Sequence, residues 1–520
     1  MGFILTLLYV ALALLSPKDL MPSLADYRVE LLVVILALLV SAPRALDGKF
    51  FRIPQNYLLA GLFAAVFLSI AIGDHWPGGG FVALQKFLPA GVAFFLVVLN
   101  CHRVERLRMV VWLVAVIAGF YVVQGARAYY AGESNIDNVC NATYDQNTPT
   151  TKLTNINETL EVCSPLLEII PRSDSSFAFR MRGLGFLKDP NEMAQLLVML
   201  LPLLWTGWLK RRHFHNILFV LAPSALFVWG MYLTHSRGAV IALVVILMLA
   251  LKDRVNLVAT LLAGVLAFGV MIVLDFSGGR EISVQASSNR FILWGDGLAL
   301  FKSSPAFGVG YENFADANKG QTAHNSFIVC LAELGLFGYG FWVAILVFTI
   351  LGLNSLLAKL KPVLNKAPPM DGDDEAPDAS DLANVEYRRW AQALRLSLAG
   401  FLAAGFFLSR AYALTLYLTL GMAVAVVCLA SEKEKALDEK PVWRQLCLSA
   451  AVGVATIALV YVALRIGNAL ALDKSGFLSQ PPESFIPSAH ASNEKSESSE
   501  YGYDNGYDNR HENDGREHDV

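Results

Sequence analysis

The chain has 520 residues, of which 55% are hydrophobic and 16% charged, and its formal net charge is -3. A mean hydropathy of +0.48 excludes a soluble multidomain protein, because soluble chains carry far less apolar sequence. The charged residues lie in loops and in the C-terminal region, without a basic stripe and interleaved aromatic residues, so nucleic-acid binding is excluded as well.

Apolar runs recur along almost the whole chain, each about as long as the 17–25 residues that cross a bilayer. They predict an all-α polytopic membrane protein with about 12–13 transmembrane helices. The first run lacks the basic residues of a signal peptide and is predicted to be a short span. The predicted spans are 2–15, 28–42, 57–72, 83–100, 109–127, 192–209, 216–234, 238–251, 256–275, 326–353, 390–409, 411–430 and 446–466.

Lysine and arginine follow alternate spans, which places those loops on the cytoplasmic side with the N-terminus inside. The basic loops contain Arg44, Lys49 and Arg52, then Arg103, Arg106 and Arg108, then Lys210, Arg211 and Arg212, then Lys252 and Arg254, and finally Lys433, Lys435 and Lys440. This order predicts N-terminal helices over 1–127, a periplasmic loop 128–191, helices over 192–275, a large periplasmic loop 276–325, a helix 326–353, a cytoplasmic linker 354–389, C-terminal helices over 390–466 and a disordered acidic tail 467–520.

The first long outer loop contains Cys140 and Cys163. A disulfide between them would suit an oxidising compartment, whereas the spacing fits two free thiols equally well. The proline-rich and acidic linker contains Asp371-Gly-Asp373, which resembles the carboxylate pair that holds a metal in nucleotide-sugar transferases. Because it lies in low-complexity sequence on the cytoplasmic side, we interpret it as part of a flexible linker.

Four arginines fall in or beside the outer loops, namely Arg182, Arg237, Arg290 and Arg410. An arginine at mid-span costs about 2.5–3.5 kcal/mol, so each alone could simply anchor a helix end at the interface. Each of them, however, stands in a short polar motif beside glycine, serine or asparagine. The planar guanidinium donates paired hydrogen bonds to phosphate oxygens, and two or three of them would neutralise a departing diphosphate without a metal ion.

A single histidine, His324, stands where the second long loop meets an apolar helix. Its ordinary pKa near 6.5 lets an imidazole take a proton from an incoming hydroxyl. The alternative is that His324, Asn325 and Ser326 only cap the helix that follows. His235 is a second candidate for which we favour a structural role. No carboxylate cluster on the outer face has metal-ligand spacing, so we expect neither a metal nor another cofactor.

The ordered motifs resemble the O-antigen ligase and O-antigen polymerase superfamily. They are Arg182-Gly-Leu-Gly-Phe with Asp189-Pro-Asn191, Ser236-Arg-Gly, Gly308-Val-Gly-Tyr-Glu-Asn313, His324-Asn-Ser-Phe and Glu333-Leu-Gly-Leu-Phe-Gly-Tyr. The resemblance covers about residues 180–345, and the pattern of spans extends it. It implies a fold similar to that of the GT-C-like lipid-linked sugar transferases, with two long periplasmic loops.

By resemblance, the protein lies in the bacterial inner membrane with its site facing the periplasm. There it would transfer a glycan from undecaprenyl diphosphate, with inversion and without metal, to lipid A-core or another glycan. His324 would activate the acceptor hydroxyl, and Arg182 and Arg237 would bind the diphosphate together with Arg290. Supporting roles would fall to Arg410, Asn325 and Glu333. The acceptor stays open, because ligases, polymerases and protein-glycosylating relatives need the same donor side.

Two other classes of function compete with a transferase. A transporter or flippase for a polar lipid predicts charges at mid-membrane and broken helices in two related halves. The sequence contains no internal repeat, and Lys86 and Glu333 are the exceptions to uncharged spans. Glu333 stands about two turns after His324, so it could face the bundle interior. A purely structural membrane anchor would leave the ordered polar motifs unexplained.

Overall fold

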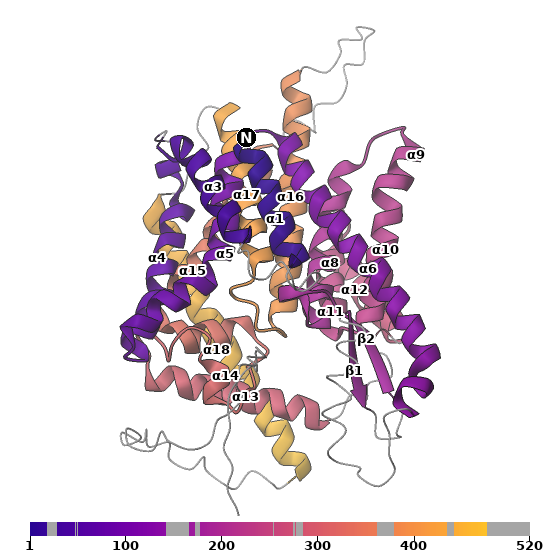
Figure 1. Ribbon diagram of the computed structural model, residues 1–520, viewed down its shortest axis with the longest axis vertical. Helices are drawn as coiled ribbons and strands as arrows, with labels where there is room; N and C mark the ends of the chain where they lie inside the picture. The colour runs from indigo at the N-terminus through magenta and orange to yellow at the C-terminus, as the bar shows by residue number, and fades with distance from the viewer. Residues whose placement is uncertain are drawn as a thin grey trace, which may run out of the picture. The chain divides into compact units, whose positions relative to one another are not determined.

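The structure is a computed structural model, and it is almost wholly helical (Figure 1). Its contacts divide the chain into two units, Met1–Asn468 and Ala469–Val520, and the candidate site belongs to the first. Most of the predicted linker and of the predicted tail lie outside the described residues. The structure describes residues 1–17, 29–46, 48, 50–141, 166–171, 177–252, 254–273, 276, 284–360, 379–433 and 441–475.

The N-terminal helices form one part of the bundle. They are α1 (Gly2–Leu15), α3 (Val29–Ala45), α4 (Pro54–Leu68), α5 (Pro77–Asn100) and α6 (Val104–Asn141). The short helical turns η2 (Phe50–Arg52) and η3 (Ser69–Gly73) flank α4. The hairpin of β1 (Leu167–Pro171) and β2 (Phe177–Met181) follows, with Leu167 paired to Met181.

The central helices come next and lead into the second long loop. They are η4 (Gly185–Leu187), α8 (Pro190–Leu204), η5 (Trp205–Gly207), α9 (His213–Asn216), η6 (Ile217–Leu221), α10 (Ala222–Thr234), α11 (Arg237–Leu251) and α12 (Leu257–Val273). The second loop contains α13 (Val284–Ser303) and α14 (Phe314–Ala317). The last helices are α15 (Ser326–Lys359), α16 (Ala379–Gly405), α17 (Leu414–Lys433) and α18 (Val442–Ser475).

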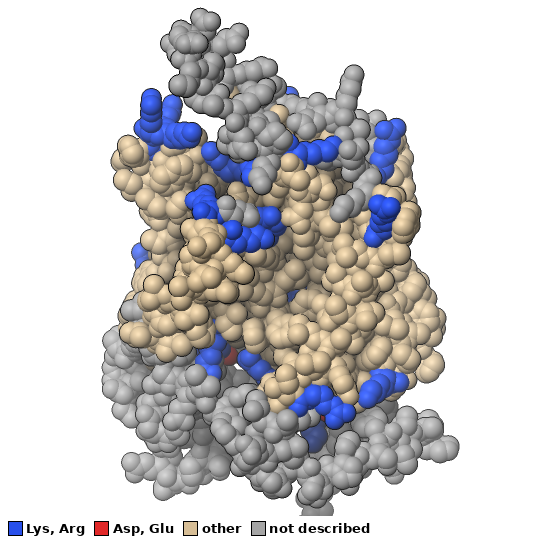
Figure 2. Space-filling view, turned by 180° about the vertical axis from the view of Figure 1, so that it is seen from behind, with Lys and Arg blue, Asp and Glu red and all other residues tan. Residues whose placement is uncertain are grey.

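Over its described residues, every predicted span overlaps one or more of these helices, and the all-α polytopic architecture is confirmed. Among the residues that the structure describes, 7 helices are long and apolar enough to cross a membrane, and α1, α11 and α12 are shorter apolar helices. On the face in Figure 2, lysine and arginine gather above and below a largely uncharged band. This distribution is expected for a helical bundle surrounded by lipid tails.

Small residues bring the central helices close together. A Cβ atom on Gly421 of α17 would stand 2.9 Å from the carbonyl oxygen of Phe94 in α5, so glycine allows these helices to pack backbone to backbone. Phe94 is fully buried, as are Tyr417 and Trp390 from α17 and α16. These contacts form the core that positions the loops at the end of the bundle.

The helix α15 is broken at Gly335, whose φ of 61° and ψ of -167° are accessible in practice only to glycine. Free backbone groups inside a membrane cost several kcal/mol each unless they are paired. Segment 305–310 pairs them here. The bonds run from Leu336 N–H to Pro305 O (2.8 Å), Phe337 N–H to Ala306 O (3.1 Å), Val309 N–H to Ala332 O (3.0 Å) and Gly310 N–H to Glu333 O (3.1 Å).

The two long loops contain more regular structure than the sequence indicated. Helix α6 continues to Asn141, and the rest of the first loop includes the hairpin of β1 and β2. The second loop includes the 20-residue helix α13. Neither the hairpin nor α13 has the sustained hydropathy on which the predicted spans depend.

Candidate functional site

The two long loops meet at one end of the bundle. In Figure 1, β1, β2, α13 and α14 all lie at the lower end, whereas α9, which follows the basic residues 210–212, lies at the upper end. Elements of both long loops therefore lie at the same end of the bundle. Arg182 directly follows β2, Arg290 lies on α13, and His324 lies between α14 and α15.

His324 is held between two anchored neighbours. The indole N–H of Trp294 in α13 donates to the carbonyl oxygen of Ala323 at 3.0 Å. The side chain of Asn325 accepts the N–H groups of Phe327 and Ile328 at 3.0 and 3.2 Å, so Asn325, rather than His324, caps α15. His324 itself takes a left-handed φ of 48° and presents an exposed side chain.

Charges from two other segments act on His324. Partial desolvation and the positive charge of Arg290 lower its pKa below the ordinary value, while Asp189 acts in the opposite direction. The imidazole is therefore neutral at neutral pH and able to accept a proton. Asp189 precedes α8 and caps it, accepting the N–H of Asn191 at 2.6 Å. The sequence predicted a site at His324 but assigned no role of its own to the Asp189 carboxylate.

Arg290 and Arg237 lie near each other although 53 positions of chain separate them. Desolvation and the charge of Arg237 lower the pKa of Arg290. Arg290 lies on α13, and Arg237 is the first residue of α11. Two cations held together repel each other, and a bound anion offsets that repulsion.

The turn before Arg237 is short. Helix α10 ends at Thr234 and α11 begins at Arg237, as the predicted spans 216–234 and 238–251 implied. The left-handed residue of this turn is His235, with φ 49°, whereas Gly238 lies inside α11. His235 is 7% exposed, and its Nε2 lies 3.1 Å from the hydroxyl of Tyr129. These contacts fit the structural role that we favoured for His235.

Arg182 stands directly after β2, where its N–H donates to the carbonyl oxygen of Leu166 at 2.8 Å. Its side chain is half-buried. The charge of Arg237 acts on Arg290, and the charges of Arg290 and Asp189 act on His324.

Arg180, two positions earlier, was not selected from the sequence. It is 4% exposed, and its guanidinium donates to Glu168 (2.7 Å), Asn191 (2.9 Å) and the carbonyl oxygen of Thr234 (2.9 Å). These bonds join the hairpin to the start of α8 and the end of α10. Arg180 therefore positions the segments that carry Arg182, Asp189 and Arg237. Because side chains alternate along β2, Arg180 lies on the opposite face of the strand from Phe179 and Met181.

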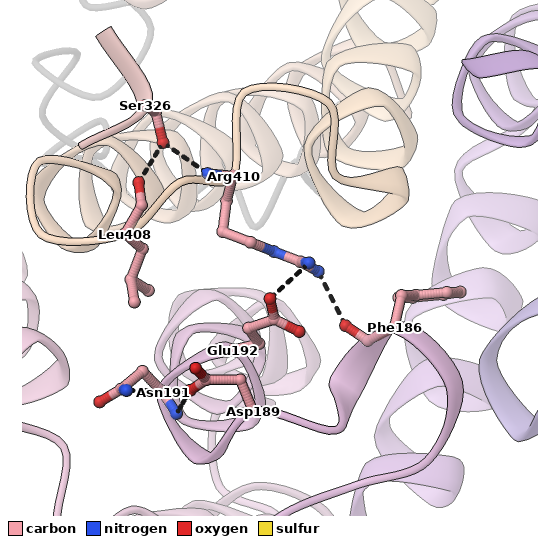
Figure 3. A network of polar contacts seen from close by, with 7 residues as sticks. All are labelled: Phe186, Asp189, Asn191, Glu192, Ser326, Leu408 and Arg410. Atoms are coloured by element: carbon pink, nitrogen blue, oxygen red, sulfur yellow. Dashed lines mark hydrogen bonds and ion pairs between the residues drawn. The ribbon is translucent and has the colours of Figure 1, made fainter. Parts of the chain in front are cut away.

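Arg410 is already paired within the protein (Figure 3). Its guanidinium donates to Glu192 at 2.7 Å and to the carbonyl oxygen of Phe186 at 3.0 Å. Both side chains of the ion pair are largely buried, at 13% and 19% exposure. The N–H of Arg410 donates to Ser326 Oγ at 2.9 Å, and that hydroxyl donates to the carbonyl oxygen of Leu408 at 2.6 Å. Arg410 thus joins the start of α15 to α8.

Glu333 faces the bundle interior, as its position in α15 predicted, and is 3% exposed. Its Oε1 accepts the N–H of Phe314 at 3.3 Å. This bond holds α14 against the part of α15 that precedes the break at Gly335. Glu333 therefore supports the loop that leads to His324. The side chains of Cys140 and Cys163, for which the sequence left a disulfide and two free thiols equally open, lie outside the described part of the chain.

The fold and the site together define a polytopic membrane protein with a cationic site and one neutral histidine at one end of its bundle. Residues 222–343 match the family model described as O-antigen ligase. This match confirms the resemblance to the O-antigen ligase superfamily over the region that carries Arg237, Arg290 and His324, and it indicates a membrane glycosyltransferase that acts on lipid-linked glycans. A comparison with curated proteins gives no match.

Proposed function

We propose that the protein transfers a glycan from undecaprenyl diphosphate to a hydroxyl of lipid A-core, at the periplasmic face of the inner membrane. The observation that carries the proposal is the grouping of Arg237, Arg290 and His324, from three segments, at one end of the bundle. A cationic pair suits the diphosphate of the donor, and a neutral imidazole beside it suits the activation of a hydroxyl.

The arginines act on the leaving group. As the bond between the anomeric carbon and the phosphate oxygen breaks, the oxygen keeps the electron pair and negative charge grows on the diphosphate. Arg237 and Arg290 stabilise that charge, and Arg182 is a third candidate contact from the neighbouring hairpin. Because these guanidinium groups are held by α11 and α13, little reorganisation accompanies the reaction.

His324 acts on the acceptor. Its neutral ring takes the proton of the acceptor hydroxyl while the oxygen attacks the anomeric carbon from the side opposite the diphosphate. This single displacement inverts the configuration of that carbon. The proton then passes from the imidazolium to solvent, and undecaprenyl diphosphate leaves. Asp189 stabilises the imidazolium, since its charge favours protonated His324.

A transporter is the second candidate, because one structural feature favours it. Helix α15 is broken at Gly335 next to a buried Glu333, and broken helices are typical of transporters. The break is filled by the protein's own segment 305–310, which leaves its backbone groups paired. A polymerase would use the same donor site and differ only in the acceptor.

The test is transfer by the purified protein in detergent with a chelator. The donor is an undecaprenyl-diphosphate glycan, and lipid A-core competes with a second lipid-linked glycan as acceptor. We expect product on lipid A-core, lost in His324→Ala and kept in His75→Ala, a matched control because His75 is exposed and also left-handed. Longer lipid-linked chains would instead identify a polymerase, and no product from either acceptor would favour the transporter.

A further inference from the structure

An open cleft of about 390 Å³ lies between α13 and the segment that follows α14. Ile292, Leu293 and Asp296 line it from α13, and Asn318, Lys319 and Gln321 line it from the segment. Neither Arg237 nor Arg290 is among its lining residues, and none of the roles proposed above uses it.

The cleft is next to the place where the acceptor hydroxyl must stand. Gln321 and His324 are three residues apart, which limits their Cα atoms to about 10 Å. Along α13, Asp296 lies about 9 Å from Arg290. The hydrogen bond from Trp294 to Ala323 joins α13 to the segment after α14, at a position on α13 between Arg290 and Asp296. One wall of the cleft therefore lies within about 10 Å of His324.

The chemistry of the lining selects one class of ligand. The Asp296 carboxylate repels a diphosphate, and the charged and amide groups disfavour an acyl chain, which would leave them desolvated. Asp296 accepts hydrogen bonds, Lys319 donates them and the amides of Asn318 and Gln321 do both. This mixture, beside the apolar edges of Ile292 and Leu293, matches a sugar ring, which has hydroxyl groups around an apolar face.

The polar groups of the cleft are also available. Lys319 and Gln321 are exposed, and within the described part of the chain the side chains of Asp296, Lys319 and Gln321 make no hydrogen bond. Partial burial raises the pKa of the Asp296 carboxyl above its ordinary value. In contrast, Asn318 donates to the carbonyl oxygen of Phe314 at 3.0 Å, which fixes the segment.

We propose that this cleft binds the terminal sugars of the acceptor and presents their hydroxyl to His324. The proposal rests on the proposed function, because it assigns the acceptor side of the same reaction. It separates the two substrates along α13, with the donor diphosphate at Arg290 and the acceptor saccharide at Asp296.

The experiment measures transfer kinetics for Asp296→Asn and Gln321→Ala, with lipid A-core as the varied acceptor. Losing one hydrogen bond should raise the acceptor KM by roughly 3- to 10-fold in each variant, while the donor KM stays as in the wild type. Asp316→Asn is the matched control, because Asp316 is an exposed acid on α14 that does not line the cleft. An unchanged acceptor KM, or a rise in the donor KM instead, would overturn the proposal.

A binding measurement separates this proposal from the transfer activity. Delipidated core oligosaccharide is titrated into the intact protein and into the same variants by calorimetry, without donor. Saturable binding that weakens in Asp296→Asn and Gln321→Ala supports the cleft as a saccharide-binding site even if no transfer is found. Absence of saturable binding by the wild type overturns this assignment even if transfer occurs.

Discussion

At the residue scale, Asp189 has a capping role and an electrostatic role. It caps α8 through the N–H of Asn191, and its charge raises the pKa of His324, against the stronger lowering by desolvation and Arg290. An asparagine can keep the cap while removing the charge. The substitution Asp189→Asn therefore separates the capping role from the electrostatic role.

We expect Asp189→Asn to move the acid limb of the pH profile of kcat/KM to lower pH. The base form of His324 is needed, so the rate falls as pH drops through its pKa. Removing a negative neighbour disfavours the imidazolium and lowers that pKa further. The profile is measured between about pH 4 and 8, with the exposed Asp74→Asn as control. A limb that stays in place or moves upward would contradict the assignment of His324 as base.

At Arg237, we expect binding of the donor diphosphate to depend on the shape of the cation as well as on its charge. We expect Arg237→Lys to reduce transfer about tenfold or more, because a point charge cannot donate the paired hydrogen bonds of the guanidinium fork. The readout is the donor KM and kcat of the purified variant. Arg211→Lys is the control, because Arg211 is exposed and stands two positions before α9, which lies at the opposite end of the bundle from α13. Normal transfer by Arg237→Lys would exclude a bidentate grip on the diphosphate.

At the scale of elements, the break in α15 couples the membrane helix to the loop that precedes His324. A Cβ atom on Gly335 would stand 2.5 Å from the carbonyl group of Ala306. The same residue has a φ of 61° that other residues avoid. Segment 305–310 therefore depends on glycine at this position for its bonds to α15.

We expect Gly335→Ala to destabilise the protein by about 1–3 kcal/mol and to lower transfer, because the loop carrying His324 loses its anchor. Gly340→Ala in the same helix is the matched control, since nothing lies within 4 Å of a Cβ atom there. It should leave stability unchanged or slightly improved. Thermal unfolding in detergent compares the two variants. Equal midpoints for both would refute a structural role of the break.

At the scale of the whole molecule, hydropathy was sufficient to predict where the helices lie. It was insufficient to predict the structure of the segments that join them. Each predicted span coincides with a helix because lipid contact demands apolar sequence. Gly335 could not be distinguished from Gly338 or Gly340, since only segment 305–310 makes it special. The hairpin and α13 were missed because they lack a sustained apolar run.

The candidate site also has features that the sequence predicts and features that it does not. Sidedness alone predicted that Arg237, Arg290 and His324 share one face, because the positive-inside rule assigns loops to sides. The ion pair of Arg410 with Glu192 joins residues 218 positions apart, and no local pattern reveals such a partner. The same holds for Asp189, whose effect on His324 arises only when α8 and the second loop come together.

The proposed periplasmic orientation makes a prediction for the intact molecule in its membrane. Helix α13, which carries Arg290, lies at the lower end, and α9, which follows the basic residues 210–212, lies at the upper end (Figure 1). Lys302→Cys at the end of α13 and Arg211→Cys near α9 place an exposed thiol at each end. In intact cells with a permeabilised outer membrane, an impermeant maleimide should label Lys302→Cys above the wild-type background and spare Arg211→Cys until the inner membrane is broken. The reverse pattern would place the site in the cytoplasm, where a donor already exported across the membrane could not reach it.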